Sequence, residues 1–439
     1  MACFKILLLL LRLGLASCAV CSPAPTRKTH RPTHRSHKPS AHPTGGPQLT
    51  PSVKPSLTPT AQPSIKPSAT NQPLSTLAPS TTKVPTRTPS FRPTVPSTTS
   101  VKLIGYIPGW LTPPPASELA AAGYTHTIVA FGVFSTTSPG TIVNAFSTVS
   151  ASYVAQLHGV GIRVLLSLGG ASTSIPNTSV DFDSVLQSAT SAQAFQNTIV
   201  ASVLSFVSSY GFDGVDFDIE HGLIPAGTFT NPTGDILVLS NIINQLHSQS
   251  PSLLISLAPQ SANIAATSGF NDPFGNYASL ILQTASSLSW VGVQIYNTGC
   301  CLGLNQVCYA TDPDTNPDFS VAMAADLLEN WPSVNSQGQQ TGFQNYISPL
   351  TPDQVVLGYP CVNANGVSDG LPATPTSTIK RAIQCLRSGT TGSSSCNTYV
   401  APRQYPTIGG VFDWQVYNDQ SNGYQFAKDM SPCLFASSC

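Results

Sequence analysis

The chain has 439 residues, enough for two average domains or one large barrel with attachments, and only 9% of them are charged. Roughly 25% is usual for a soluble domain. The two signs are segregated: residues 22–100 carry ten Lys or Arg and no acid, whereas residues 101–439 carry seven basic and nineteen acidic residues, a formal net charge of −12. An acidic globular part lacks the basic surface that nucleic-acid binding needs, so we expect no nucleic-acid partner.

The first nineteen residues are typical of a secretory signal peptide. Lys5 precedes an apolar run over 6–15, and residues 17–19 (Ser-Cys-Ala) are small enough for cleavage. The run is shorter than the about 20 apolar residues that span a bilayer, and no later run reaches that length. We therefore expect a secreted protein, extracellular or associated with a cell wall, without a membrane span. A bacterial lipoprotein signal at 15–18, with lipid on Cys18, is the alternative.

Residues 20–100 are predicted to form a basic, low-complexity linker rich in Pro, Ser and Thr. Segment 22–100 holds seventeen prolines, and Pro-Ser-Val-Lys-Pro-Ser at 51–56 recurs as Pro-Ser-Ile-Lys-Pro-Ser at 63–68. Such a composition cannot bury enough apolar surface to offset its ordering entropy, so the linker is expected to stay extended and solvated. Its role is either that of a spacer or that of a basic anchor on an acidic wall polysaccharide.

Residues 101–439 are predicted to form one α/β domain in which short apolar runs alternate with helical patterns. Strand–helix alternation predicts a parallel sheet, and eight strands predict a closed (β/α)8 TIM barrel. An open doubly wound sheet would bring a Gly-rich phosphate loop after the first strand, and the segment 105–110 (Gly-Tyr-Ile-Pro-Gly-Trp) does not fit that pattern. The predicted strands are Lys102–Ile107, His126–Gly132, Ile162–Leu168, Asp213–Ile219, Leu253–Ala258, Trp290–Tyr296, Gln354–Pro360 and Ile408–Trp414. The predicted helices include Ser191–Tyr210, Ile236–Gln249, Ala278–Ser289 and Val321–Asn330.

The fourth predicted strand alternates acidic and apolar residues, in Asp213-Gly-Val-Asp216-Phe-Asp218-Ile-Glu220. Because side chains alternate sides along a strand, Asp216, Asp218 and Glu220 share one face, which would point into the barrel. Three carboxylates in a low-dielectric interior repel one another and are costly to desolvate, so folding alone does not favour them. Glu220 falls at the C-terminal end of the strand, where TIM barrels build their active sites.

A metal site and a structural hydrogen-bonded cluster are the alternatives to acid catalysis on this strand. A calcium loop needs Asn, Gly and turn residues between its ligands, whereas this strand has Val, Phe and Ile there. We therefore predict acid catalysis without a metal or another cofactor.

Eight of the eleven cysteines lie in the globular part, which suggests disulfides in an oxidising compartment. Zinc binding is the alternative, but no C-x-x-C pair or nearby His cluster is present. The nearest sequential pairs predict the bridges Cys385–Cys396 and Cys433–Cys439. The eight residues are Cys300, Cys301, Cys308, Cys361, Cys385, Cys396, Cys433 and Cys439.

The acidic strand, continuing into His221-Gly222, resembles the signature of glycoside hydrolase family 18, particularly its class III chitinases of plants and fungi. Ser167-Leu-Gly169-Gly170 resembles the family's S-x-G-G, and the segments 258–260, 294–297 and 410–414 resemble its fifth, sixth and eighth strands. These groups occur in the family's order and at barrel spacing, so the resemblance covers the whole predicted barrel. The start, 106–110, looks more like bacterial-type members, and the Cys-bearing loop at 300–308 has no counterpart in the pattern.

This resemblance implies a secreted, endo-acting chitinase that hydrolyses β-1,4 links between N-acetylglucosamine units by a retaining, substrate-assisted mechanism. Glu220 would be the general acid, Asp218 would bond the substrate's acetamide N–H, and Asp216 would share a proton with Asp218. Tyr296 would orient the acetamide carbonyl, and Trp414 would form the floor of the sugar subsite next to the cleaved bond. Further substrate contacts are expected from Gln294, Asn297, Tyr106, Gly169 and Gly170, and structural support from Asp213 and Ser167.

The same resemblance implies cis peptides at Ala130–Phe131 and Trp414–Gln415, chitin or chitooligosaccharides as partners, and a monomer. Two rival functions remain. Some barrels of this family are catalytically silent lectins, but these usually lack the glutamate that stands here at Glu220. Endo-β-N-acetylglucosaminidases acting on N-glycans share the D-G-x-D-F-D-x-E core, although the continuation over 219–222 favours a chitinase.

Overall fold

The computed structural model describes residues 101–264, 270, 276–305, 307–310, 316–331, 346–371, 373–436 and 439. The predicted signal peptide (1–19) and linker (20–100) lie outside the described residues. Within the described ranges, no helix combines the length and the apolar character that crossing a membrane requires.

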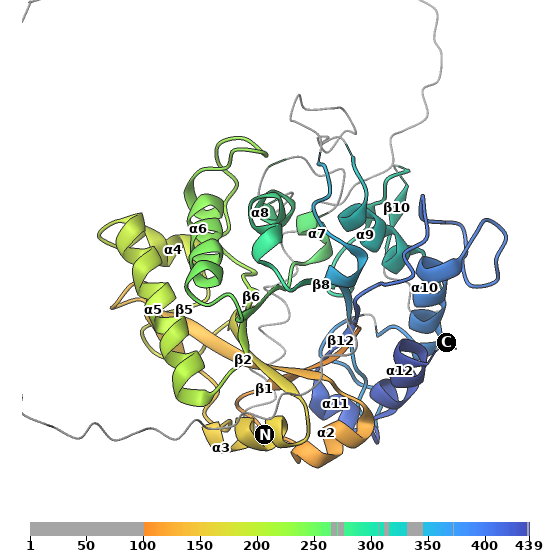
Figure 1. The fold of residues 1–439 in the computed structure, drawn as a ribbon, viewed down its shortest axis with the longest axis horizontal. Helices are drawn as coiled ribbons and strands as arrows, with labels where there is room; N and C mark the ends of the chain where they lie inside the picture. Colours follow the sequence, from red (N-terminus) through yellow and green to blue (C-terminus); the bar gives the residue numbers. More distant parts are fainter. Residues whose placement is uncertain are drawn as a thin grey trace, which may run out of the picture. The chain divides into compact units, whose positions relative to one another are not determined.

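Eight parallel strands form a closed barrel (Figure 1). The first, β1 (Lys102–Pro108), closes the barrel by pairing with both β2 (His126–Ser135) and β12 (Gly410–Trp414). The predicted (β/α)8 barrel is therefore confirmed, and the open-sheet alternative is wrong. The remaining barrel strands are β4 (Arg163–Gly169), β6 (Gly214–Asp218), β7 (Leu254–Leu257), β8 (Trp290–Gln294) and β11 (Val355–Pro360).

The eight predicted strands agree with the observed ones to within three residues at each end. The largest difference is in β2, which runs three residues beyond its predicted end. There it pairs antiparallel with β3 (Ile142–Asn144) and β5 (Thr178–Ser179), two short strands outside the barrel. These partners supply the hydrogen bonds that extend the strand.

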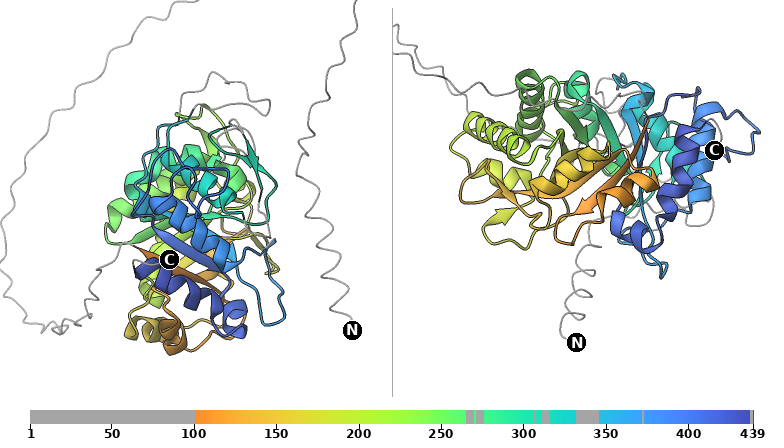
Figure 2. Two further views of the ribbon diagram at one scale, coloured as in Figure 1. Left: turned by 90° about the vertical axis from the view of Figure 1, so that its right-hand side faces the viewer. Right: turned by 60° about the horizontal axis from the view of Figure 1, so that its bottom comes forward.

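Helices follow the strands and surround the barrel, as the additional views show (Figure 2). Local signals define α5 (Ala192–Tyr210), where the Ser191 side chain accepts the backbone N–H of Ala194 and Gly211 ends the helix at φ 79°. These are the usual N-cap and C-cap devices. The other helices are α2 (Ala116–Ala122), α3 (Ala151–Gly159), α4 (Phe182–Gln187), α6 (Gly234–Gln249), α7 (Ser261–Ile264), α8 (Asn276–Thr284), α9 (Asp318–Leu328), α10 (Thr376–Ser388), α11 (Val416–Ser421) and α12 (Gln425–Phe435).

The helix predicted over 278–289 ends earlier than expected. The α-helix α8 stops at Thr284 and is followed by a 3-10 turn, η1 (Ala285–Ser287). The side-chain amide of Gln354 donates to the carbonyl oxygens of Ala285 (3.3 Å) and Leu288 (2.9 Å). These tertiary hydrogen bonds satisfy carbonyl groups at the end of the helix.

Apolar side chains fill both sides of the barrel wall, and alternation along each strand separates the two sides. In β1, Leu103 and Ile107 pack between the strands and the surrounding helices. Ile104 and Tyr106 belong instead to a second cluster, together with Trp290 and residues of the other strands. Tyr106 also bonds the carboxylate on β6, so this second cluster lines the barrel interior.

Three disulfides occur among the described residues, and two of them confirm the predicted bridges Cys385–Cys396 and Cys433–Cys439. The third, Cys300–Cys308, closes the loop after β8, where the strands β9 (Cys301–Leu302) and β10 (Cys308–Tyr309) form a hairpin. The expectation that the eight cysteines pair is wrong for Cys361, which is a buried thiol. Its sulfur lies 3.4 Å from the carboxylate of Asp413.

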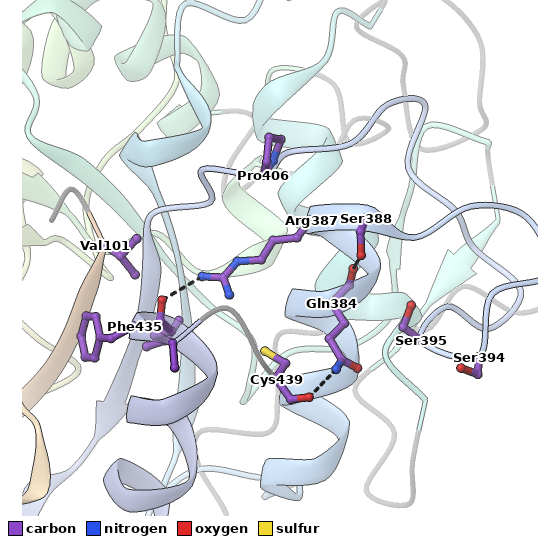
Figure 3. Close-up of a pocket in the computed structure, with 11 residues that line it drawn as sticks. Val101, Gln384, Arg387, Ser388, Ser394, Ser395, Pro406, Phe435 and Cys439 are labelled. Atoms are coloured by element: carbon purple, nitrogen blue, oxygen red, sulfur yellow. Dashed lines mark hydrogen bonds between the residues drawn. The ribbon is translucent and has the colours of Figure 1, made fainter.

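A cavity of about 690 Å³ lies beside Val101, at the N-terminal end of the barrel (Figure 3). Arg387 of α10 donates from Nη1 and Nη2 to the carbonyl oxygens of Cys433 (2.7 Å) and Leu434 (3.3 Å) in α12. Gln384 donates to the carbonyl of residue 439 at 2.6 Å. These hydrogen bonds connect α10 to the C-terminal end of α12 and to residue 439. Because all barrel strands are parallel, the cavity is at the opposite end of the barrel from Glu220.

Candidate active site

Asp216 lies on β6 inside the barrel and is fully buried. Its carboxylate accepts hydrogen bonds from the hydroxyl groups of Tyr106 (3.0 Å), Ser167 (2.8 Å) and Ser256 (2.7 Å). These donors come from β1, β4 and β7. Burial raises the pKa of Asp216, and the three hydroxyl donors oppose the rise because they stabilise the charged form.

Asp218 is the last residue of β6 and lies in the same interior row. Its Oδ1 accepts a hydrogen bond from Nε2 of Gln294 (3.0 Å), and the same nitrogen donates to the carbonyl oxygen of Ala258. Burial raises the pKa of Asp218 well above its usual range, and the nearby carboxylates of Glu220 and Asp216 raise it further. The site therefore favours a protonated Asp218.

Glu220 lies two residues past the end of β6 and is the one member of the acidic row that is partly exposed. Its Oε2 accepts a hydrogen bond from Nε2 of Gln260 at 3.0 Å. Burial raises the pKa of Glu220, while the neighbouring His221 and the bond from Gln260 act in the opposite direction. A carboxyl group whose pKa is raised and that still faces solvent is suited to general acid catalysis.

The backbone that carries Asp218 and Glu220 is held by a tyrosine from α8. The Tyr277 hydroxyl accepts the N–H of Ile219 (2.9 Å) and contacts the carbonyl oxygens of Ile219 (3.1 Å) and Phe217 (3.3 Å). This contact fixes the strand end after the regular ladder has stopped.

An aromatic surface begins at Trp414, the last residue of β12. Its ring lies 5.8 Å from the ring of Tyr106 and stacks on Phe131 at 5.9 Å. Phe131 in turn stacks on Trp110 at 6.3 Å, and Trp110 is 52% exposed. The surface therefore leads from the barrel interior to solvent.

Two non-proline cis peptides occur at this surface, Ala130–Phe131 and Trp414–Gln415. Both confirm the expectation from the resemblance.

Gly169 allows β4 to approach β6 closely, and Gly170, just after β4, packs against Phe131 of β2. A side chain on Gly169 would lie 2.3 Å from the carbonyl oxygen of Asp218, and one on Gly170 would lie 2.7 Å from the Phe131 ring. Both glycines have positive φ, 106° and 82°. The structure thus gives them a packing reason, and their substrate contacts stay a prediction.

Tyr296 and Asn297 follow β8 at the same end of the barrel. Tyr296 is buried, and its pKa is raised well above its usual range by burial and then by Asp218 and Glu220, so its hydroxyl group lies near the acidic row. Asn297 is exposed and exchanges two hydrogen bonds with the backbone of Leu371, at 2.8 and 2.9 Å.

Asp213 directly precedes β6, at the opposite end of this strand from Glu220. Its carboxylate contacts His158 Nε2 (2.7 Å), Arg163 Nη1 (2.8 Å) and the backbone N–H of Val164 (2.9 Å). Burial would raise the pKa of Asp213, but these hydrogen bonds outweigh it and lower the pKa to about 2. The contacts join the start of β6 to β4, which agrees with the structural role predicted for Asp213.

Several residues of the site were not predicted from the sequence, and two of them have a signal in it. Ser256 and Gln260 stand at alternate positions on and after β7, so they share the inward face with Ala258. Tyr277 has no such signal, because it comes from a helix 57 residues after Glu220. Across the described residues, no group of three or more His, Cys, Asp or Glu side chains is arranged to bind a metal ion.

A glutamate with a raised pKa at the open end of a TIM barrel, next to buried acids and an aromatic surface, defines a glycoside hydrolase by fold and site. The comparison with protein families agrees: the sequence model of glycosyl hydrolases family 18 matches residues 102–430. The chain belongs to this family, which confirms the resemblance found in its sequence.

The relatives of the chain are named as chitinases. It is 29% identical to Chitinase D of Niallia circulans over 310 residues, which cover 68% of this chain and 54% of that protein. It is 30% identical to Chitinase Chi52 of Paenibacillus xylanexedens over 292 residues, 64% and 50% of the two proteins. The chain thus spans about half the length of these curated relatives. The crystal structure of the Legionella pneumophila ChiA C-terminal domain is 58% identical, with a TM-score of 0.74, and the match covers 77% of this chain and 99% of that one.

Proposed function

We propose that the protein is a chitinase that cuts β-1,4 links between N-acetylglucosamine units within the polymer. The observation that carries this proposal is the row of Asp216, Asp218 and Glu220 on one face of β6, with Glu220 at the open end of the barrel. The printed names of the relatives support chitin as the substrate.

In the proposed reaction, Glu220 protonates the glycosidic oxygen of the leaving sugar. The substrate's acetamide oxygen attacks the anomeric carbon, while Asp218 bonds the acetamide N–H and stabilises the positive charge on the oxazolinium ring. Asp216, which accepts hydrogen bonds from three hydroxyl groups, shares the proton of Asp218 as this charge develops. Water then opens the ring, with Glu220 now acting as the base.

Tyr296 and Trp414 position the reacting sugar in this proposal. Tyr296 is buried in the same interior cluster as Tyr106, and in this proposal its hydroxyl group orients the acetamide carbonyl. Trp414 offers a half-buried indole ring as the floor of the sugar subsite. The aromatic surface that continues through Phe131 to Trp110 supports binding of several sugar units, as an endo-acting enzyme needs.

We also propose that the enzyme is secreted and acts as a monomer, and that its basic segment 22–100 either spaces the barrel from a surface or binds acidic wall polysaccharide. The signal-like residues 1–19 support secretion, and the ten basic residues of the segment support its proposed role.

A parallel digest tests the proposed substrate. The protein should release soluble chitooligosaccharides from colloidal chitin and leave the glycans of a high-mannose glycoprotein intact, while its Glu220→Gln variant should release neither. Release of N-glycans without chitin cleavage would identify an endo-β-N-acetylglucosaminidase. Chitin binding without any cleavage by the unmodified protein would identify a lectin.

A further inference from the structure

The loop between β11 and α10 is attached to the end of β8 beside Tyr296. The N–H of Asn297 donates to the carbonyl oxygen of Leu371, and its Oδ1 accepts the N–H of Leu371. Gly370 packs against the Tyr296 ring so closely that a side chain there would lie 2.9 Å from a ring carbon. One end of this loop is therefore fixed to the proposed acetamide site.

Asp369, one residue earlier in the loop, makes a second attachment. Its Oδ2 accepts hydrogen bonds from Nε2 of Gln415 (2.7 Å) and Nδ2 of Asn418 (3.3 Å). Gln415 directly follows Trp414, and Asn418 lies in α11. The carboxylate thus joins the loop to the segment that carries the indole floor of the site.

Both ends of the Gln415 side-chain amide make a hydrogen bond in this arrangement. While its Nε2 donates to Asp369, its Oε1 accepts the backbone N–H of Tyr417 at 3.0 Å. Gln415 is only 6% exposed, so an amide left without its acceptor would lack a solvent replacement. A charged acceptor also makes the shorter and stronger kind of hydrogen bond.

Asp369 itself is exposed, so it contributes no side chain to the core. The indole ring of Trp414 packs on Tyr106 and Phe131 and is still partly open, as a sugar-binding ring must be. Packing does not cover that open side. The backbone there is held by hydrogen bonds from the Cys361 N–H to the Trp414 carbonyl oxygen (2.8 Å) and from the Asn418 N–H to the Gln415 carbonyl oxygen (3.0 Å). The bond between Gln415 and Asp369 adds an attachment of the Gln415 side chain to the loop.

We propose that Asp369 is a positioning residue that sets the orientation of Trp414 through Gln415. It thereby sets the affinity of the sugar subsite whose floor is the indole ring of Trp414. This inference rests on the proposed function, because Trp414 forms the floor of a sugar subsite only if the protein binds chitooligosaccharides.

Calorimetric titration with a chitooligosaccharide in a Glu220→Gln background measures that affinity without turnover. We expect Asp369→Ala to weaken binding about tenfold, the effect of an unsatisfied buried donor. Asp369→Asn, which keeps an acceptor oxygen, should weaken it less. The matched control is Glu118→Ala, which removes an exposed carboxylate that also accepts two side-chain hydrogen bonds, from Gln420 and Tyr424, at 3.2 and 2.9 Å. It should leave Kd unchanged.

A double-mutant cycle with Trp414→Ala separates positioning from a general structural effect. If Asp369 acts through Trp414, Asp369→Ala should cause no further loss of affinity once Trp414 is removed. Equal losses in both backgrounds, or an unchanged Kd for Asp369→Ala alone, would overturn the inference. Should Asp369→Ala fail to fold, the same cycle with Asp369→Asn decides between the outcomes. Failure of the parent Glu220→Gln protein to bind any chitooligosaccharide would instead count against the proposed function.

Discussion

Three carboxyl groups, two on β6 and one just past its end, have raised pKa values but different surroundings. Asp216 accepts three hydroxyl donors, which favour its charged form. Asp218 is buried between two other acids, so its pKa rises well above the usual range. Glu220 is partly exposed and also has a raised pKa, owing to burial. The raised pKa values of Asp218 and Glu220 favour the protonated form that general acid catalysis requires.

Replacing the proposed acid tests this arrangement directly. Glu220→Gln keeps the shape of the side chain and an oxygen that can accept from Gln260, but it cannot donate a carboxylic proton. We expect turnover on chitooligosaccharides to fall by at least about 10²-fold, the usual contribution of a general acid. Thermal unfolding should show an unchanged midpoint. Turnover like that of the unmodified protein would remove Glu220 from the mechanism.

A second acid gives a prediction for stability and pH. Asp235 is 3% exposed, and its pKa is raised to about 6, by burial first and then by the nearby Asp183 and Asp181. Because the ordinary value is near 3.8, the protonated side chain favours the fold. This contribution is complete below about pH 4 and is lost as the pH rises through 6.

Asp235→Asn should therefore raise the melting temperature at pH 7.5 and leave it unchanged at pH 4. The asparagine oxygen can still accept the backbone N–H of Ile224, as the carboxylate does at 2.9 Å. Differential scanning calorimetry at the two pH values checks this result. Equal shifts at both values would show that the charge of Asp235 is not the cause.

At the scale of single elements, the strands were predictable because each one is a short apolar run with its own local boundaries. The differences arise where distant residues act. β2 is longer than predicted because β3 and β5 pair with its end, and α8 is shorter because Gln354 bonds the carbonyl groups beyond it. Neither partner can be recognised from the local sequence.

The same distinction applies to the site. Asp216 and Asp218 lie on a regular strand and Glu220 lies two residues past its end, so a period of two predicts which side chains point inward. Tyr277 and Asp369 come from a helix and a loop, where no period relates them to β6. Their contribution depends on folded geometry, so the sequence alone does not indicate it.

The bridge Cys385–Cys396 provides a prediction for one element. It joins α10 to the loop that follows, and it closes a segment of 11 residues. Replacing both cysteines by serine should lower the free energy of unfolding by about 2–4 kcal/mol, the usual effect of a disulfide. Activity at 25 °C should not change, because the bridge is remote from Glu220. Denaturant unfolding with and without a reductant checks this, and equal midpoints for the variant and the oxidised parent would contradict it.

At the scale of the whole molecule, the closed parallel barrel brings separate strand ends together. β1, β4, β7, β8 and β12 all end at the same rim as β6, so Tyr106, Ser167, Ser256, Gln294 and Trp414 surround one acidic row although they are spread over some 300 residues of sequence. Most of the donors to the row come from regular strands. The site is therefore held by the barrel itself, and the loops add Asp369 and Trp110 at its rim.

The same geometry predicts the stereochemistry of the proposed reaction. An ordinary retaining glycosidase has two carboxyl groups about 5–5.5 Å apart, one of them a nucleophile. The α-carbons of Asp218 and Glu220, two residues apart on one strand face, are about 6.6 Å apart. Both acids thus approach the sugar from the same side, and neither is placed for attack on the opposite face. We therefore expect the substrate's acetamide oxygen to attack, as in the substrate-assisted mechanism of family 18.

Hydrolysis should accordingly retain the anomeric configuration and require an N-acetyl group on the sugar that is cut. NMR of freshly released products should show the β-anomer first, and a thiazoline mimic of the oxazolinium intermediate should inhibit the enzyme. Fully deacetylated chitosan should not be cut, because it lacks the oxygen that attacks. Efficient cleavage of that chitosan, or an initial α-anomer, would refute the mechanism even if chitin proved to be the substrate.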